Sequence, residues 1–183
     1  MKVQSIGVQL SGLRPLMFDR YAGDNSTQLP LAEKMYLGEK RELLIPAVNI
    51  YSLLCAENTK SVCRQFFGKN GKTIGLGIAS YTSISPFDIP ITMNGKDVVF
   101  DGFGKNGITT HKSVARVKGG IPNPKERPLL SGPWQLTFTI EYQDNKFCTV
   151  ENLRQALSMA GTLGLGTFRP FFGRFEMTGF VEK

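Results

Sequence analysis

The last third of the chain carries the pattern that most restricts its fold: a strand, a helix and a second strand in succession. From Trp134 to Tyr142, large apolar residues alternate strictly with polar ones, which is the period of a half-buried strand. Residues 149–161 predict an amphipathic helix capped by Thr149 and ended by Gly161, because their apolar side chains follow the i, i+3, i+4, i+7 spacing. Residues 174–181 predict a closing strand. Elements of this kind, each with one apolar face, favour a sheet backed by helices.

The preceding sequence adds weaker signals. Alternation predicts a first strand over residues 3–10, and Pro46, which a helix tolerates in its first turn, opens a helical pattern that reaches about Phe67. Residues 73–79 and 89–100 predict short strands, the second with a turn at Asn94-Gly95. Residues 29–36 are expected to form a short helix or an irregular arm. The whole chain, 1–183, is expected to be a single α+β domain: a ferredoxin-like (RRM-like) antiparallel sheet with two helices and insertions.

The composition favours a polyanionic partner. The net charge is +7, with 41% hydrophobic and 20% charged residues, as in a soluble globular protein. No apolar run approaches the ~20 residues of a membrane span, and the N-terminus shows no signal-peptide pattern, so no membrane is expected. Three cysteines without a metal-like pair predict a reduced, cytoplasmic protein with neither disulfides nor bound metal. No cofactor is expected, since Gly75-Leu76-Gly77 lacks the ending of a P-loop.

The segment 161–175 is the strongest candidate site. It places four glycines and two arginines between the predicted helix and the closing strand. Glycine allows a ligand to approach the backbone closely, and exposed N–H groups beside arginine suit phosphate oxygens. We therefore expect phosphate-backbone binding by these residues: Gly164, Gly166, Arg169, Gly173 and Arg174. The alternative is a tight helix-to-strand turn whose arginines lie in solvent.

A second basic segment, residues 104–131, is rich in glycine and proline and is expected to form a hairpin or loop insertion. Its cations Lys112, Arg116 and Lys118 would follow a nucleic-acid backbone, or would be solvated surface charges. His111 precedes them and is a candidate general acid or base for RNA cleavage, although a single histidine without an identified partner is more often structural.

Three stretches resemble the RAMP superfamily of CRISPR effector complexes, particularly the backbone subunits that line up along guide RNA. Residues 11–16, Ser-Gly-Leu-Arg-Pro-Leu, resemble the family's stretch after its first strand. Residues 44–53, Leu-Ile-Pro-Ala-Val-Asn-Ile-Tyr-Ser-Leu, occupy the place of its Ile-Pro-Gly-Ser-Ser-Leu-Lys-Gly pattern. Its glycine-rich loop is similar to residues 164–175. The chain departs from the pattern at Ala47, where the family has glycine, and at Tyr51, where a phosphate-contacting lysine is common; a divergent version encoded by a mobile element or phage would explain this.

The resemblance implies guide-RNA binding, assembly into a homo-oligomer or effector complex, and RNA contacts by Asn49 and Tyr51. It also implies that the basic hairpin folds over the guide. Binding would be largely independent of sequence and sensitive to salt. Some family members cleave target RNA with an acidic residue after the first strand, which makes Asp19 and Asp24 candidates here, although an aspartate in a Gly-Asp-Asn loop is more often a turn residue.

Three functions stay open at this point. The favoured one is a non-enzymatic RNA-binding protein that holds guide or single-stranded RNA within a ribonucleoprotein complex of antiviral defence. The second is an endoribonuclease that uses His111 or Asp24. The third is a protein-interaction module that mimics or caps a CRISPR backbone subunit.

Overall fold

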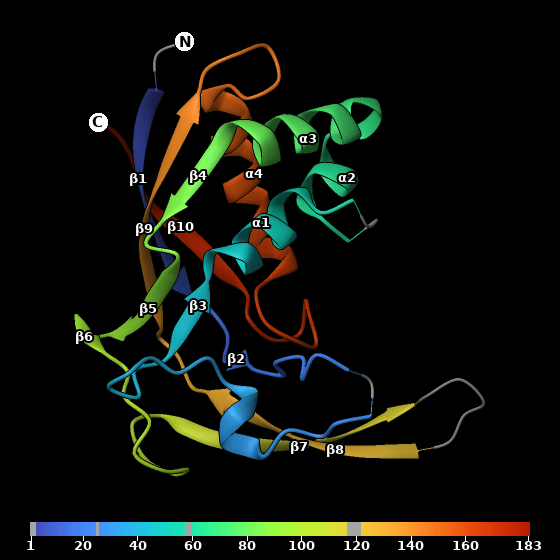
Figure 1. Ribbon diagram of the computed structural model, residues 1–183, viewed down its shortest axis with the longest axis vertical. Coiled ribbons are helices and arrows are strands. Elements are labelled where there is room, and N and C mark those ends of the chain that lie inside the picture. The colour runs from blue at the N-terminus through green and yellow to red at the C-terminus, as the bar shows by residue number, and fades with distance from the viewer. Residues whose placement is uncertain (1–2, 25, 58–59, 117–121) are drawn as a thin grey trace.

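The computed structural model describes residues 3–24, 26–57, 60–116 and 122–183, with the backbone alone described at 115–116 and 122–123. Its larger sheet is built around β9, which lies at the centre (Figure 1). The strand order is β10-β1-β9-β5-β3, β4 also pairs with β9, β6 pairs with β5, and all of these pairs are antiparallel. The strands are β1 (Val3–Gly12), β3 (Leu44–Pro46), β4 (Thr82–Ser85), β5 (Asp88–Met93), β6 (Lys96–Asp97), β9 (Gln135–Gln143) and β10 (Phe175–Glu182).

Four α-helices cover one face of this sheet (Figure 1). They are α1 (Ala47–Cys55), α2 (Val62–Phe66), α3 (Gly71–Tyr81) and α4 (Val150–Leu163), and two 3-10 helices lie at Leu31–Lys34 and Gly68–Asn70. The inner strands β10-β1-β9-β4, with helices after β1 and β9, form the ferredoxin-like arrangement. The predicted α+β, ferredoxin-like class is therefore confirmed. No helix in the described part of the chain is long and apolar enough to cross a bilayer.

The core fills the space between the sheet and the helices. In β9, the alternating residues Leu136, Phe138, Ile140 and Tyr142 are all buried. The apolar stripe of α4 belongs to the same core, and the first turn of α4 is capped by Thr149, whose hydroxyl accepts a hydrogen bond from the Asn152 N–H at 3.1 Å. The predicted strand and the predicted cap are thus both confirmed, because each depends on a local period or a local hydrogen bond.

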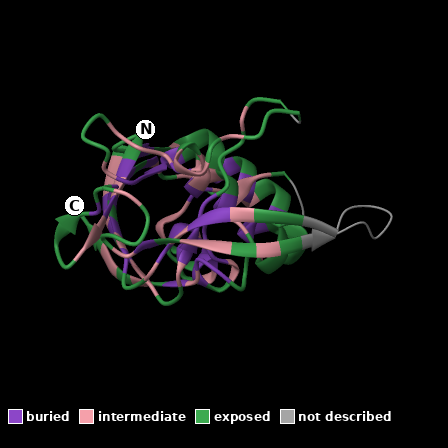
Figure 2. Ribbon diagram, turned by 90° about the horizontal axis from the view of Figure 1, so that it is seen from below, coloured by how far each residue is buried: buried purple, intermediate pink, exposed green. Residues whose placement is uncertain are grey.

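A second, three-stranded sheet lies below the first and carries the basic segment. It has the order β2-β8-β7, with β2 (Leu16–Met17), β7 (Ile108–Arg116) and β8 (Pro122–Leu130). β7 and β8 form a hairpin in which His111 lies opposite Arg127. The hairpin is buried where it meets the body, as at Ile108 and Leu130, and its described residues become exposed further out (Figure 2).

The strand predicted at residues 73–79 is wrong, because this segment belongs to α3. Leu76 and the isoleucines beside it alternate with glycines in the sequence, but the glycines allow α3 to pack closely on α2 and on the connection before α4. A Cβ on Gly71 would lie 2.1 Å from the Cys63 carbonyl oxygen of α2, and one on Gly77 would lie 2.6 Å from Cβ of Phe147. Close helix contacts have overridden the low helix propensity of glycine.

Two predicted helix boundaries are also corrected. The single helix expected from Pro46 to Phe67 is divided into α1 and α2, with Pro46 preceding α1 as its N-cap. Gly161 does not end the last helix, which continues to Leu163. It lies inside α4, where the helix packs closely on the closing strand β10. A Cβ at this position would lie 2.0 Å from the carbonyl oxygen of Phe175, so the close approach requires glycine.

Candidate functional site

The glycine-rich loop after α4 is held against the N-terminal part of the chain by backbone hydrogen bonds. The N–H of Leu165 donates to the carbonyl of Gly173 at 2.9 Å and closes the loop on itself. The N–H of Thr167 donates to the Met17 carbonyl at 3.0 Å, and the N–H of Gly173 donates to the Pro15 carbonyl at 2.8 Å. The loop is therefore docked on the segment that contains β2.

The glycines of the loop make this close docking possible. A Cβ on Gly166 would lie 2.3 Å from the Met17 carbonyl oxygen, and one on Gly173 would lie 1.9 Å from the Leu165 carbonyl oxygen. Gly164 and Gly173 are buried, and their N–H groups donate to the carbonyls of Ala160 and Pro15. The expectation that these two amides face a phosphate does not agree with this geometry, so side chains would have to contact an anion here.

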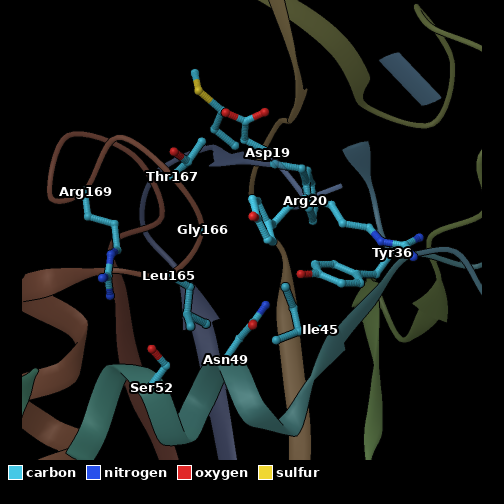
Figure 3. A pocket seen from close by; sticks show the side chains of 13 residues that line it. Asp19, Arg20, Tyr36, Ile45, Asn49, Ser52, Leu165, Gly166, Thr167 and Arg169 are labelled. Carbon is cyan, nitrogen blue, oxygen red and sulfur yellow. The ribbon is translucent and has the colours of Figure 1, made fainter. Parts of the chain in front are cut away.

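A cavity of about 290 Å³ lies between the loop, α1 and the segment after β2 (Figure 3). Its apolar floor includes Ile45 and Leu165. The remaining lining residues are mostly polar or aromatic: Met17, Phe18, Asp19, Arg20, Tyr21, Tyr36, Asn49, Ser52, Gly166, Thr167 and Arg169. Sequence positions more than a hundred residues apart thus meet in one place, which is a common property of ligand sites.

α1 supplies Asn49 and Ser52 to this cavity because residues three apart share one face of a helix. The opposite face carries Ile50 and Leu53, which are buried in the core. Figure 3 shows both polar side chains directed from α1 toward the cavity. Within the described residues neither side chain forms a hydrogen bond, so both keep their donors and acceptors for a ligand.

Two arginines give the cavity a positive charge. The Arg20 guanidinium carbon lies 5.6 Å from the centre of the Tyr36 ring, a cation–π contact. Arg169 donates a hydrogen bond to the Gly164 carbonyl at 3.3 Å. Partial burial lowers the pKa of the Arg169 guanidinium, which remains a cation at neutral pH. Arg169 also borders a second depression of about 510 Å³, beside Lys60 and Phe168.

A buried arginine of the hairpin links these parts together. The Nε of Arg127, a residue only 5% exposed, donates to the Asp19 carboxylate at 2.7 Å. Its guanidinium carbon lies 4.9 Å from the centre of the Phe168 ring, and one of its terminal nitrogens donates to the Ser113 hydroxyl at 3.4 Å. Phe168 has φ of 56°, an uncommon backbone conformation for a bulky residue. The hairpin base, the loop and the Asp19 segment therefore form one connected unit.

The predicted cations of the hairpin are only partly described. Lys112 is exposed, and its Nζ lies 4.0 Å from a carboxylate oxygen of Glu126. The side chain of Arg116 and the whole of Lys118 lie outside the described residues.

The structure also places two other expected residues away from the cavity. The Tyr51 hydroxyl donates to the Thr82 carbonyl at 2.7 Å, on the side of α1 toward β4, and burial raises the pKa of this phenol. Arg174 donates to the Thr162 carbonyl at 3.4 Å and borders a different depression, between α4 and β10. The two arginines of the loop, Arg169 and Arg174, are thus not brought together.

The candidate catalytic residues form ordinary structural contacts. The Asp24 carboxylate accepts hydrogen bonds from the N–H and hydroxyl groups of both Ser26 and Thr27, and these bonds lower its pKa well below the usual range. Such a carboxylate is a poor base, and its contacts are those of a turn residue. The His111 ring packs edge-on against Phe172, with 5.3 Å between the ring centres.

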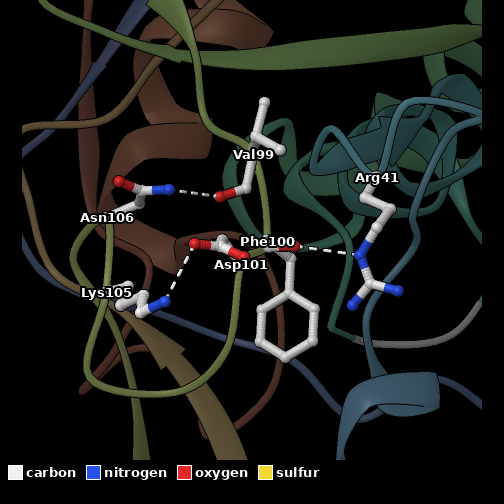
Figure 4. Close-up of polar contacts among 6 residues, drawn as sticks. All are labelled: Arg41, Val99, Phe100, Asp101, Lys105 and Asn106. Atoms are coloured by element: carbon white, nitrogen blue, oxygen red, sulfur yellow. Dashed lines mark hydrogen bonds and ion pairs between the residues drawn. The ribbon is translucent and has the colours of Figure 1, made fainter.

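A further cluster of polar residues lies between β6 and β7 and serves the fold (Figure 4). Lys105 pairs with Asp101 at 3.0 Å, and the Asn106 amide donates to the Val99 carbonyl at 2.7 Å. Arg41 donates through Nε to the Phe100 carbonyl at 3.0 Å. These interactions hold the β6–β7 connection, and they engage cations that would otherwise be candidates for binding an anion.

Sequence reasoning missed several residues of the cavity, among them Arg20, Tyr36, Ser52 and Thr167. A signal existed for Ser52, which follows Asn49 by the three-residue spacing of one helix face. Arg20 and Tyr36 lie in a segment without regular periodicity, and their proximity arises from long-range contacts such as the Arg20 N–H donating to the Lys34 carbonyl. No local pattern could have found them.

Comparisons with known proteins show similarity in structure but not in sequence. No family model and no curated protein matches the chain. The fold is similar to a chain of the Type III-B Cmr-beta complex, whose cryo-EM structure contains cognate target RNA, with a TM-score of 0.65 and 12% identity. The match covers 99% of this chain and 61% of the other, so this chain spans about three fifths of the length of its structural neighbour. At this identity the likeness establishes the fold, a mixed α+β domain with a ferredoxin-like antiparallel sheet.

Proposed function

We propose that this protein binds single-stranded or guide RNA through the sugar–phosphate backbone and acts as a subunit of a CRISPR-type ribonucleoprotein complex. The observation that carries this proposal is the cavity between the glycine-rich loop and α1. Arg20 and Arg169 border it together with Asn49, whose amide is unpartnered within the described residues. The guanidinium groups are suited to phosphate oxygens, and the amide is suited to a phosphate oxygen or to a base edge.

The fold supports the same proposal. Its structural neighbour belongs to a complex bound to RNA, and the net charge of +7 favours a polyanion over a neutral ligand. The connected unit of Arg127, Asp19 and Phe168 would hold the hairpin and the loop in a fixed relation, so that one RNA strand could contact both. Side-by-side assembly with further copies or with other subunits is part of this proposal.

The test is RNA affinity, measured by fluorescence anisotropy with a labelled single-stranded oligonucleotide. Arg169→Ala should weaken binding about tenfold, since hydrogen bonds to charged groups contribute about 1.5–3 kcal/mol. The slope of log K against log salt should become shallower by about 0.7, the value for one lost phosphate contact on a single strand.

The matched control is Lys96→Ala, which removes one exposed cation from β6, away from the cavity. It should leave the affinity within about twofold, because an exposed charge outside the binding site contributes little. Equal losses in both variants would show that binding follows net charge alone and would contradict the site. A wild-type protein that binds no RNA but purifies with a protein complex would favour the capping function instead.

A further inference from the structure

The cavity beside α1 has the features of a pocket for a flat, polar ring. The Arg20 guanidinium lies over the Tyr36 ring, and the Tyr36 hydroxyl and Ile45 border the same space (Figure 3). Single-stranded RNA is commonly recognised by placing an unstacked base against an aromatic ring or a guanidinium plane. The volume of about 290 Å³ is at the small end of ligand pockets, which suits one base rather than a stack of bases.

Asn49 provides a group that could bond to the edge of such a base. Its side chain is half-buried, points into the cavity, and has no hydrogen-bond partner among the described residues. A carboxamide presents one donor and one acceptor side by side, which matches the polar edge of an unstacked base, where a donor and an acceptor are also adjacent. A phosphate would need donors alone and would leave the Asn49 carbonyl oxygen unused.

We propose that this cavity accepts a single unstacked nucleobase and that Asn49 bonds to its hydrogen-bonding edge. This inference rests on the proposed function and deepens it: Arg169 contacts the backbone, whereas the cavity holds one base of each bound segment. The backbone of the strand would pass along the loop, and one base would turn inward between α1 and Arg20.

The experiment compares a labelled oligouridylate with an abasic strand of the same charge, each about 12 units long, within the range that a single-stranded binding domain covers. The wild-type protein should bind the oligouridylate about tenfold more tightly than the abasic strand, as expected for one stacked and hydrogen-bonded base. Asn49→Ala removes the donor and the acceptor together, so it should weaken binding of the oligouridylate about fivefold and leave binding of the abasic strand unchanged.

Val48→Ala is the matched control, because it truncates the adjacent, exposed position of α1, which does not line the cavity. It should leave the affinity for both strands within about twofold. Equal binding of the two strands by the wild type, or an equal loss for both in Asn49→Ala, would overturn base binding and leave backbone binding standing. Failure of the wild type to bind either strand would overturn the proposed function as well.

Discussion

Two glycine-rich stretches of this protein look alike in sequence and serve different physical purposes. Gly75-Leu76-Gly77 lies in α3, and Gly164-Leu165-Gly166 lies in the loop after α4. In α3 the glycines have helical backbones and supply space: a Cβ on Gly75 would already be 3.3 Å from Cβ of Cys63. In the loop the glycines supply both space and positive φ, 78° at Gly164 and 75° at Gly166.

A spacing of glycines therefore does not by itself identify a binding loop. What separates the two stretches is the backbone conformation, which depends on where the chain must turn. Glycines of this chain fall into three groups: those needed for space, those needed for positive φ, and those needed for both. Substitution by alanine should lower the free energy of unfolding most where both properties are needed.

Gly173→Ala should have the largest effect, because this position demands both properties. Its φ is 71°, and a Cβ would lie 1.9 Å from the Leu165 carbonyl oxygen. The left-handed backbone costs a side chain about 1–2 kcal/mol, and overpacking adds about 1–3 kcal/mol, so the free energy of unfolding should fall by about 2–5 kcal/mol. Urea denaturation measures this loss. RNA affinity should fall too, since the loop carries Arg169. A loss below about 1 kcal/mol would mean that the loop relaxes freely and that the close approach is not required.

Gly71→Ala should have an intermediate effect, because only space is lacking there. Its backbone is helical, with φ of −57°, but a Cβ would lie 2.1 Å from the Cys63 carbonyl oxygen. Overpacking should cost about 2 kcal/mol net, after a gain of up to about 1 kcal/mol from the better helix propensity of alanine. Thr73→Ala, at an exposed position of the same helix, is the control and should stay within about 0.5 kcal/mol. Binding of RNA by the folded protein should be unchanged in both variants, since α3 does not line the cavity.

The same distinction explains how much of the fold could be predicted from the sequence. The strand at 134–142 and the Thr149 cap are encoded by their own neighbours, so periodicity and a local hydrogen bond were sufficient. α3 was not predictable in this way, because the reason for its glycines is the Cys63 backbone of another helix. Gly161 was misplaced for the same reason, since β10 requires it.

The residues of the candidate site also differ in whether a local sequence pattern indicates them. Arg169 and Gly166 were found because they lie in one dense stretch of glycine and arginine, and Asn49 because it lies in a stretch that resembles a known family. Arg20 and Arg127 were not assigned to the site, since Arg20 reaches it from an irregular segment and Arg127 from the base of a hairpin. Their roles depend on long-range contacts that no local pattern encodes.

Gly68→Ala should have the smallest effect and isolates the requirement for positive φ. Gly68 has φ of 54°, and no atom lies within 4 Å of the position that a Cβ would take. The cost is therefore that of the left-handed backbone alone, about 1 kcal/mol, and urea denaturation should show it without any change in RNA affinity. Gly68→Asn is the matched comparison, because asparagine tolerates this conformation and should lose less stability than alanine. If alanine and asparagine cost the same, the positive φ of Gly68 would not be what this position requires.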